Sequence, residues 1–298
     1  MRLLANPTLR LFIGAALISL SPVWVKLVDV SATSSAFWRV AIGGSVLAAY
    51  LLLMRKRLQF SAALWGMLVV AAVFLALDLL FYHRSIQYIG PGLSTLLANF
   101  QVFVMAAAGY LILREPPSTK QLVAIPLALL GLALIVGLDW GALSADYRQG
   151  IVFGLCAAVT YAFYLLSMRR SRQGSTNRVP IREIAVVSVL TAAMLGTAAL
   201  AEGDSLAVTS GEDIAWLACY GILSHGFGMM FIASSLPHVT PSQAGLALLL
   251  QPTLSFVWDV LFFGRPMTPI ELTGAAIALF AIYLGSRVRS EQVQDTGQ

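Results

Sequence analysis

Charged residues are scarce in this 298-residue chain. Asp, Glu, Lys and Arg together make up 11% of it, whereas about a quarter of a soluble domain is charged. Hydrophobic residues account for 58%, and the mean hydropathy is +0.82. This balance excludes an ordinary soluble enzyme or nucleic-acid-binding domain and predicts an integral membrane protein.

Cysteines and catalytic motifs are also largely missing. The two cysteines, Cys156 and Cys219, lie inside apolar runs and predict no disulfide framework. The chain has no HExxH motif, no phosphate-binding glycine loop, no CxxC pair and no plausible Ser-His-Asp set at one membrane depth. We therefore expect neither an enzyme nor an ATP-driven pump, and no metal or cofactor.

Long apolar runs are abundant. A membrane-spanning helix needs about 20 mostly apolar residues, and the chain has ten runs of that kind, joined by short connectors. The first run extends to Val28 without a small-residue cleavage site, so we interpret it as a retained helix rather than a signal peptide. The fold class predicted is all-α integral membrane, with ten transmembrane helices. Their predicted ranges are 9–28, 33–54, 62–82, 90–113, 119–138, 149–168, 181–201, 213–236, 241–263 and 268–286.

The net charge of +5 comes from an uneven distribution of Lys and Arg among the connectors. If the N-terminus is cytoplasmic, the connectors on the cytoplasmic side carry most of these residues and the opposite side has only Arg84, Arg148 and Arg265. The positive-inside rule then predicts a multi-pass protein of the bacterial inner membrane with both termini in the cytoplasm. The same asymmetry explains the basic charge without a nucleic-acid partner. The cytoplasmic connectors hold Arg55, Lys56, Arg57, Arg114, Lys120, Arg169, Arg170, Arg172, Arg178 and Arg182.

The chain repeats itself internally. A shift of 150 positions aligns residues 81–135 with 231–285 without a gap and pairs Pro91 with Pro241 and Gln101 with Gln251. We predict a first repeat over residues 1–140, a second over 147–288 and a cytoplasmic tail over 289–298. Because five helices per repeat is an odd number, the second repeat must be inverted, as in many secondary transporters.

In this arrangement the sequence resembles the drug/metabolite transporter superfamily, specifically its ten-helix branch with two EamA repeats. The resemblance covers nearly the whole chain, although Val102 stands where the second repeat has Pro252, and Arg265 where the first has Glu115. Within that family the chain is most similar to the aromatic amino-acid exporters of the YddG type. The residues that carry the resemblance to the EamA branch are Trp24-Val25-Lys26, Arg39, Glu115, Gln121, Gln251-Pro252 and Gly274.

The resemblance implies export of small metabolites, most of all aromatic or neutral amino acids, by alternating access. The partners implied are a small-molecule substrate and the lipid bilayer; the sequence leaves the oligomeric state open. The alternatives are an exporter of another cargo, such as a cationic drug, an intramembrane enzyme and a channel. The absent catalytic set disfavours the enzyme, and inverted symmetry without a continuous polar ring disfavours the channel.

Four charged residues of the predicted spans are candidates for a role in transport, and all of them lie in the outer half: Lys26, Arg39, Asp78 and Asp259. Placing each of these charges in lipid costs free energy, so we expect each to have a structural or functional role. Two interpretations remain open: structural ion pairs that close the outer side, or a gate in which one carboxylate binds a proton or a substrate ammonium group. Asp78 is the better candidate for the second, because Tyr82 lies one helical turn away.

Neutral polar and aromatic residues complete the predicted substrate site. Asn99, Gln101 and Gln251 are candidate contacts for a zwitterion, and interhelical bonding fits them as well. Tyr82, Phe163 and Tyr164 predict an apolar wall, or ordinary packing. Pro91 and Pro241 stand at helix ends, where hinges and ordinary turns are both plausible.

Overall fold

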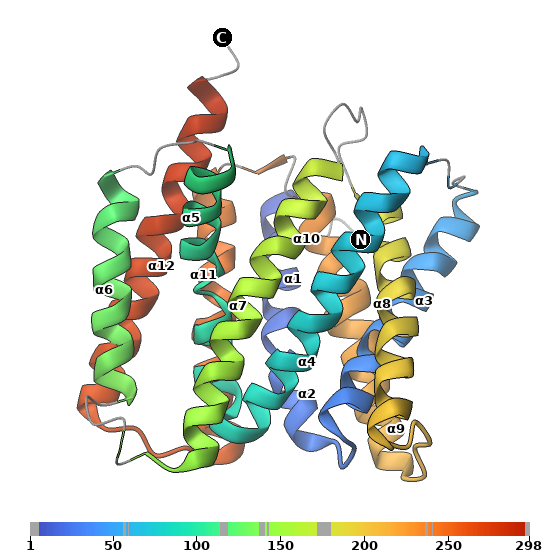
Figure 1. The fold of residues 1–298 in the computed structure, drawn as a ribbon, viewed down its shortest axis with the longest axis horizontal. Coiled ribbons are helices and arrows are strands. Elements are labelled where there is room, and N and C mark those ends of the chain that lie inside the picture. The colour runs from blue at the N-terminus through green and yellow to red at the C-terminus, as the bar shows by residue number, and fades with distance from the viewer. Residues whose placement is uncertain are drawn as a thin grey trace.

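A computed structural model describes residues 6–55, 58, 60–113, 119–136, 141, 143–171, 180–235, 238–239 and 241–295. All regular structure in these ranges is helical, and the helices pack side by side into one bundle (Figure 1). The first half of the chain forms α1 (Pro7–Ser19), α2 (Ser21–Leu27), α3 (Ala32–Leu53), α4 (Ala62–Ala98), α5 (Gln101–Leu113) and α6 (Thr119–Val136). The second half forms α7 (Ala145–Ser171), α8 (Ile181–Glu202), α9 (Gly211–Cys219), the π-helix η3 (Tyr220–Gly228), α10 (Met229–Ser235), α11 (Pro241–Phe263) and α12 (Pro269–Asp295).

The apolar runs become helices that are long enough to cross a bilayer. Six helical stretches of the described chain meet the length and hydropathy of a membrane span, and three shorter apolar helices lie at 122–135, 250–263 and 269–284. Side-chain caps fix several of the helix starts. Asn6, for example, accepts hydrogen bonds from the backbone N–H groups of Thr8 and Leu9, and Ser61 accepts one from that of Leu64. The chain is therefore an all-helical, multi-pass membrane protein.

The third predicted run is longer than expected. The connector predicted between residues 82 and 90 is wrong, because α4 continues to Ile89 and the chain reverses only at Gly90, where φ is +82° and ψ is 170°. A straight helix over 62–108 would be about 70 Å long, more than twice the roughly 30 Å of a hydrocarbon core. Only glycine adopts this backbone conformation readily, so Gly90 is what turns one long apolar segment into two crossings.

The two halves begin at opposite ends of the bundle. In Figure 1, α1 starts and α12 ends at the upper end, whereas α7 starts at the lower end. Hydrogen bonds from the guanidinium of Arg10 to the Ser235 hydroxyl and the Ser234 carbonyl oxygen fasten the start of α1 to the end of α10.

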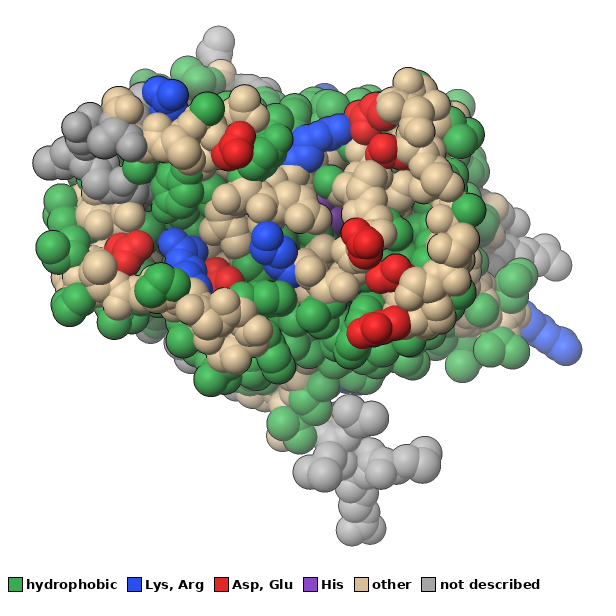
Figure 2. All heavy atoms as spheres, turned by 90° about the horizontal axis from the view of Figure 1, so that it is seen from below, with side chains coloured by type: hydrophobic (Ala, Val, Ile, Leu, Met, Phe, Trp, Pro, Cys, Tyr) green, Lys and Arg blue, Asp and Glu red, His purple; other side chains and the backbone are tan. Residues whose placement is uncertain are grey.

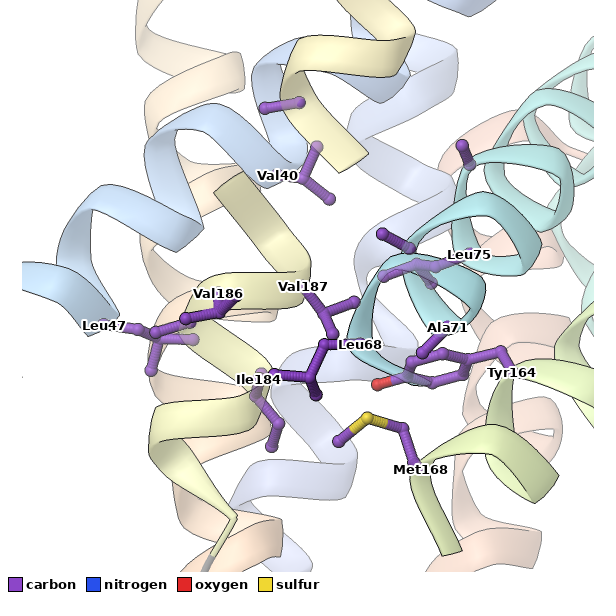
Figure 3. Packing of buried hydrophobic residues seen from close by; sticks show 14 of the residues in the cluster. Val40, Leu47, Leu68, Ala71, Leu75, Tyr164, Met168, Ile184, Val186 and Val187 are labelled. Atoms are coloured by element: carbon purple, nitrogen blue, oxygen red, sulfur yellow. The ribbon is translucent and has the colours of Figure 1, made fainter. Parts of the chain in front are cut away.

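The largest apolar cluster joins α3, α4, α7 and α8 (Figure 3). Leu47, Leu68 and Val187 are at most 1% exposed there, and Met168 closes the cluster from α7. Figure 3 shows the Tyr164 hydroxyl pointing from α7 across the cluster toward Leu68. These contacts hold together the helices that carry the polar residues described next.

Candidate functional site

A polar cluster lies inside the bundle, where α3, α4, α7 and η3 meet. Asp78 of α4 is 7% exposed, and among the residues that the structure describes no side chain forms a hydrogen bond or ion pair with it. Arg39 of α3 acts on Asp78 electrostatically without bonding to it. The site thus holds an acid and a guanidinium that interact electrostatically but form no ion pair with each other.

Arg39 is held by a chain of hydrogen bonds. Its Nη1 donates to the Tyr220 hydroxyl oxygen at 3.1 Å, and its guanidinium lies 5.2 Å from the centre of the Tyr220 ring. The Tyr220 hydroxyl oxygen is 3.0 Å from His83 Nε2, and His83 Nδ1 donates to the Leu79 carbonyl oxygen at 2.8 Å. Because that carbonyl can only accept, the neutral imidazole presents Nε2 as the acceptor of the Tyr220 O–H.

Three tyrosine side chains lie near the acid. Tyr82, Tyr161 and Tyr164 all interact electrostatically with Asp78. Phe163 stacks on Phe74 with ring centroids 5.2 Å apart. Of the predicted aromatic residues, the structure thus brings Tyr82 and Tyr164 near Asp78. Tyr82 also forms a 2.8 Å hydrogen bond with the Thr95 hydroxyl, in the same helix.

The three predicted amides lie on three different helices: Asn99 caps the end of α4, Gln101 begins α5 and Gln251 belongs to α11. Asn99 donates from Nδ2 to the Thr95 carbonyl oxygen at 2.8 Å, within its own helix. Gln101 is 9% exposed, and its Oε1 is buried without a hydrogen-bond partner. Gln251 is half-buried on α11. Of the three, Gln101 has a polar atom left free for a ligand.

Asp259 and Lys26 lie apart from Asp78 and make local contacts. Asp259 Oδ2 accepts from the backbone N–H of Gly92 at 2.9 Å and from Arg265 Nη1 at 3.4 Å, and Arg265 also donates to the Ile89 carbonyl oxygen. These bonds hold α11 and the segment after it against the turn at Gly90. Lys26 donates to the Gln87 carbonyl oxygen at 3.2 Å.

The two predicted hinge residues start helical segments. Pro91 is buried directly after Gly90, and its carbonyl oxygen accepts from the Thr95 hydroxyl at 2.8 Å. Pro241 is the first residue of α11, but its side chain lies outside the described part of the chain.

Several helices near the cluster are irregular. The first apolar segment is interrupted at Leu20, α4 gives way to α5 at residues 99–100, and η3 is a nine-residue π-helix. Neighbouring side chains satisfy the freed backbone groups: the Ser224 hydroxyl donates to the Leu17 carbonyl oxygen at 2.7 Å, and that of Ser255 to Ser19 at 3.0 Å. Irregular backbone at membrane depth is tolerated where protein covers it or where it lines a cavity, as in transporters.

Sequence reasoning missed Tyr220, His83 and Tyr161. His83 fell in the predicted connector, and the two tyrosines looked like ordinary aromatic residues of apolar runs. The available signal was the sequence Asp78 to His83, which places an acid, a tyrosine and a histidine within two turns of one helix.

The lower end of the bundle is mixed in charge. Figure 2 shows acidic and basic side chains together on this face, with apolar side chains around them. Arg84 pairs with Glu202 at 2.7 Å, and Glu202 also accepts from the Thr33 hydroxyl. Some residues of the sequence argument lie outside the described part: Lys56, Arg57, Arg114, Glu115, Arg172 and Arg178, and the side chain of Gln121.

The bundle, its interrupted helices and the buried, unpaired acid define a class: a polytopic helical protein that handles a solute within the membrane. The chain belongs to the EamA-like transporter family, whose model matches it twice, over residues 8–137 and 148–287. Family membership makes it a transporter and not an enzyme, as predicted, and agrees with the resemblance to the drug/metabolite transporter superfamily.

Proteins similar in sequence to this chain are also named as transporters. An "uncharacterized transporter" of Archaeoglobus fulgidus is 24% identical over 218 residues, which cover 72% of this chain and 74% of that protein. The "uncharacterized inner membrane transporter YhbE" of Escherichia coli strain K12 is 26% identical over 217 residues, 67% of this chain and 64% of that one. A protein of known crystal structure shares the fold at a TM-score of 0.65 over 99% of both chains, with 18% identity.

Proposed function

We propose that this transporter exports aromatic or neutral amino acids by alternating access. The observation that carries the proposal is the buried Asp78 carboxylate without a side-chain partner among the described residues, with aromatic rings around it. A buried carboxylate costs several kcal/mol unless a cation joins it. The ammonium group of an amino acid supplies that cation, and the rings of Tyr82, Phe163 and Tyr164 suit an apolar side chain.

The proposed architecture is ten crossings in two inverted repeats. Read along the chain, the turn at Gly90 and the joining of α1 with α2, α4 with α5 and α9 with α10 leave five crossings in each half. The opposite starting ends of α1 and α7 support inversion (Figure 1). Two such halves can pack in two related ways, which opens a central site first to one side and then to the other.

The proposed orientation puts the upper end of Figure 1 in the cytoplasm of a bacterial cell. Arg55, Arg169, Arg170 and Arg182 belong to helix ends at that end of the bundle. The mixed face of Figure 2 is then the outer one. The positive-inside rule supports this placement, with both termini inside.

Flux into proteoliposomes tests the cargo. The purified protein should take up labelled phenylalanine and tryptophan with saturation, and unlabelled amino acid inside the vesicles should accelerate uptake by exchange. Liposomes without protein and a cationic dye are the controls. Transport of the dye without saturable flux of either amino acid would reject the amino-acid assignment.

A further inference from the structure

Arg39 is a half-buried cation that lacks a carboxylate partner among the described residues. Its Nε is closed off from solvent and has no hydrogen-bond partner, and no acid of the described chain lies within ion-pair distance of it. Within the described part of the chain, only Nη1 of the guanidinium has a side-chain acceptor, the neutral Tyr220 hydroxyl. A guanidinium with a buried, unpartnered Nε is costly, and its open N–H groups are suited to an oxyanion.

Two residues keep the guanidinium in place. The Tyr220 ring lies under it and the Tyr220 hydroxyl accepts from it, so both the plane and one edge are fixed. His83 in turn orients that hydroxyl, because its Nε2 accepts the O–H while Nδ1 is committed to Leu79. A donor group held in this way loses little conformational entropy when an anion arrives.

We infer that Arg39 is the carboxylate-binding residue of the transport site, and that Tyr220 and His83 are its positioning residues. Arg39 and Asp78 come from different helices, α3 and α4, and act on one another without bonding. A ligand with opposite charges at its two ends could pair with both groups. The inference rests on the proposed function and sharpens it, because it requires the cargo to carry a carboxylate and disfavours a purely cationic drug.

Three related probes test the assignment on the purified protein: phenylalanine, phenethylamine, which lacks the carboxylate, and 3-phenylpropionate, which lacks the ammonium group. Binding is followed as the concentration-dependent rise in melting temperature. In the wild-type protein phenylalanine should bind about ten- to 100-fold more tightly than phenethylamine, the range expected for hydrogen bonds to a charged group. In Arg39→Gln the two should bind equally, and 3-phenylpropionate should no longer bind.

Tyr220→Phe is the second variant, and it keeps the ring under the guanidinium while removing the hydroxyl. It should reduce the preference for phenylalanine over phenethylamine without abolishing phenethylamine binding, which a general loss of structure would not do. Tyr88→Phe, at a half-exposed tyrosine of the same helix as His83, should leave the preference unchanged. If Arg39→Gln does not fold, the comparison is made with Arg39→Lys, which keeps the charge and loses the planar fork, and should lower the preference.

The possible outcomes distinguish the assignment of Arg39 from the proposed amino-acid cargo. An unchanged preference in folded Arg39 and Tyr220 variants would overturn the inference while leaving the amino-acid cargo in place. Binding of 3-phenylpropionate but not phenylalanine to the wild-type protein would reject the amino-acid cargo and keep the Arg39 subsite. Tightest binding of phenethylamine to the wild-type protein would reject both.

Discussion

Asp78 is placed where a proton and an ammonium group would compete for one carboxylate. It is 7% exposed, and Arg39, the base that acts on it, does not reach it with a hydrogen bond. Replacing Asp78 with Asn preserves the volume and removes the group for which both cations compete. Under the proposed function, Asp78 therefore links pH to transport.

We predict that wild-type affinity for phenylalanine falls as the pH is lowered, because protons occupy Asp78. In Asp78→Asn the affinity should be low and independent of pH. Initial rates of uptake into proteoliposomes over a pH series measure the pH dependence of the wild-type protein and of the variant. A wild-type pH profile in the variant would leave Asp78 with a structural role only.

Asp259→Asn is the matched control for this substitution. Asp259 is also buried, at 2% exposure, but it holds the backbone N–H of Gly92 and the guanidinium of Arg265. An amide oxygen can still accept from Gly92, so the variant should lose stability through the unpaired Arg265 and keep its pH dependence.

At the scale of single residues, the sequence reveals a candidate site residue only where placing that residue in lipid costs much free energy. Asp78 and Arg39 were recognised because a charge inside an apolar run is expensive wherever it lies. Tyr220 was not, because a tyrosine in lipid has an ordinary packing role and only the fold brings its hydroxyl between Arg39 and His83. Similarly, nothing local in the sequence shows that Asp259 lies against Gly92, 167 positions away in the chain.

At the scale of the element, the backbone conformation of Gly90 determines where the chain turns within α4. Its φ of +82° with ψ of 170° is a conformation open essentially to glycine alone, and a Cβ there would lie 3.1 and 3.3 Å from the two carboxylate oxygens of Asp259. Gly90→Ala should therefore destabilise the protein by about 1–3 kcal/mol. Thermal unfolding in detergent measures the effect.

Gly203→Ala is the comparison, since Gly203 also has positive φ, at +81°, but nothing lies within 4 Å of its Cβ position. The left-handed conformation alone costs roughly 1–2 kcal/mol in a residue with a side chain, so its melting temperature should drop less. Equal drops would mean that the contact with Asp259 adds nothing.

Hydropathy located the helices well because the lipid imposes a strong, local requirement on each span. It failed where tertiary contacts decide the backbone. Residues 83–89 looked like a connector because His83, Arg84 and Gln87 are polar, yet they remain helical with partners on other helices: Tyr220, Glu202 and Lys26. The interruption at Leu20 and the π-helix η3 escaped prediction for the same reason, since Ser224 and Ser255 satisfy freed carbonyl groups from distant positions.

At the scale of the whole molecule, the direction of α7 relates the two halves. Its first turn contains Asp146 and its last turn contains Arg169 and Arg170, so the two ends of one helix differ in charge. If residues 1–140 and 147–288 are inverted repeats, α7 must start on the side opposite to the start of α1. Its end at Arg170 must then share a side with both termini.

Single cysteines test this threading. In a background where Cys156 and Cys219 are replaced by Ala, Asp146→Cys should react with a membrane-impermeant maleimide in intact spheroplasts, because the proposed orientation puts it on the outer face. Arg170→Cys, and tags at both ends of the chain, should stay protected until the membrane is permeabilised. Both positions are exposed at helix ends, so protection would reflect the side of the membrane rather than burial in the protein. Labelling of both cysteines from outside, or tags on opposite faces, would contradict the inverted arrangement and with it a central site that alternates between the two sides.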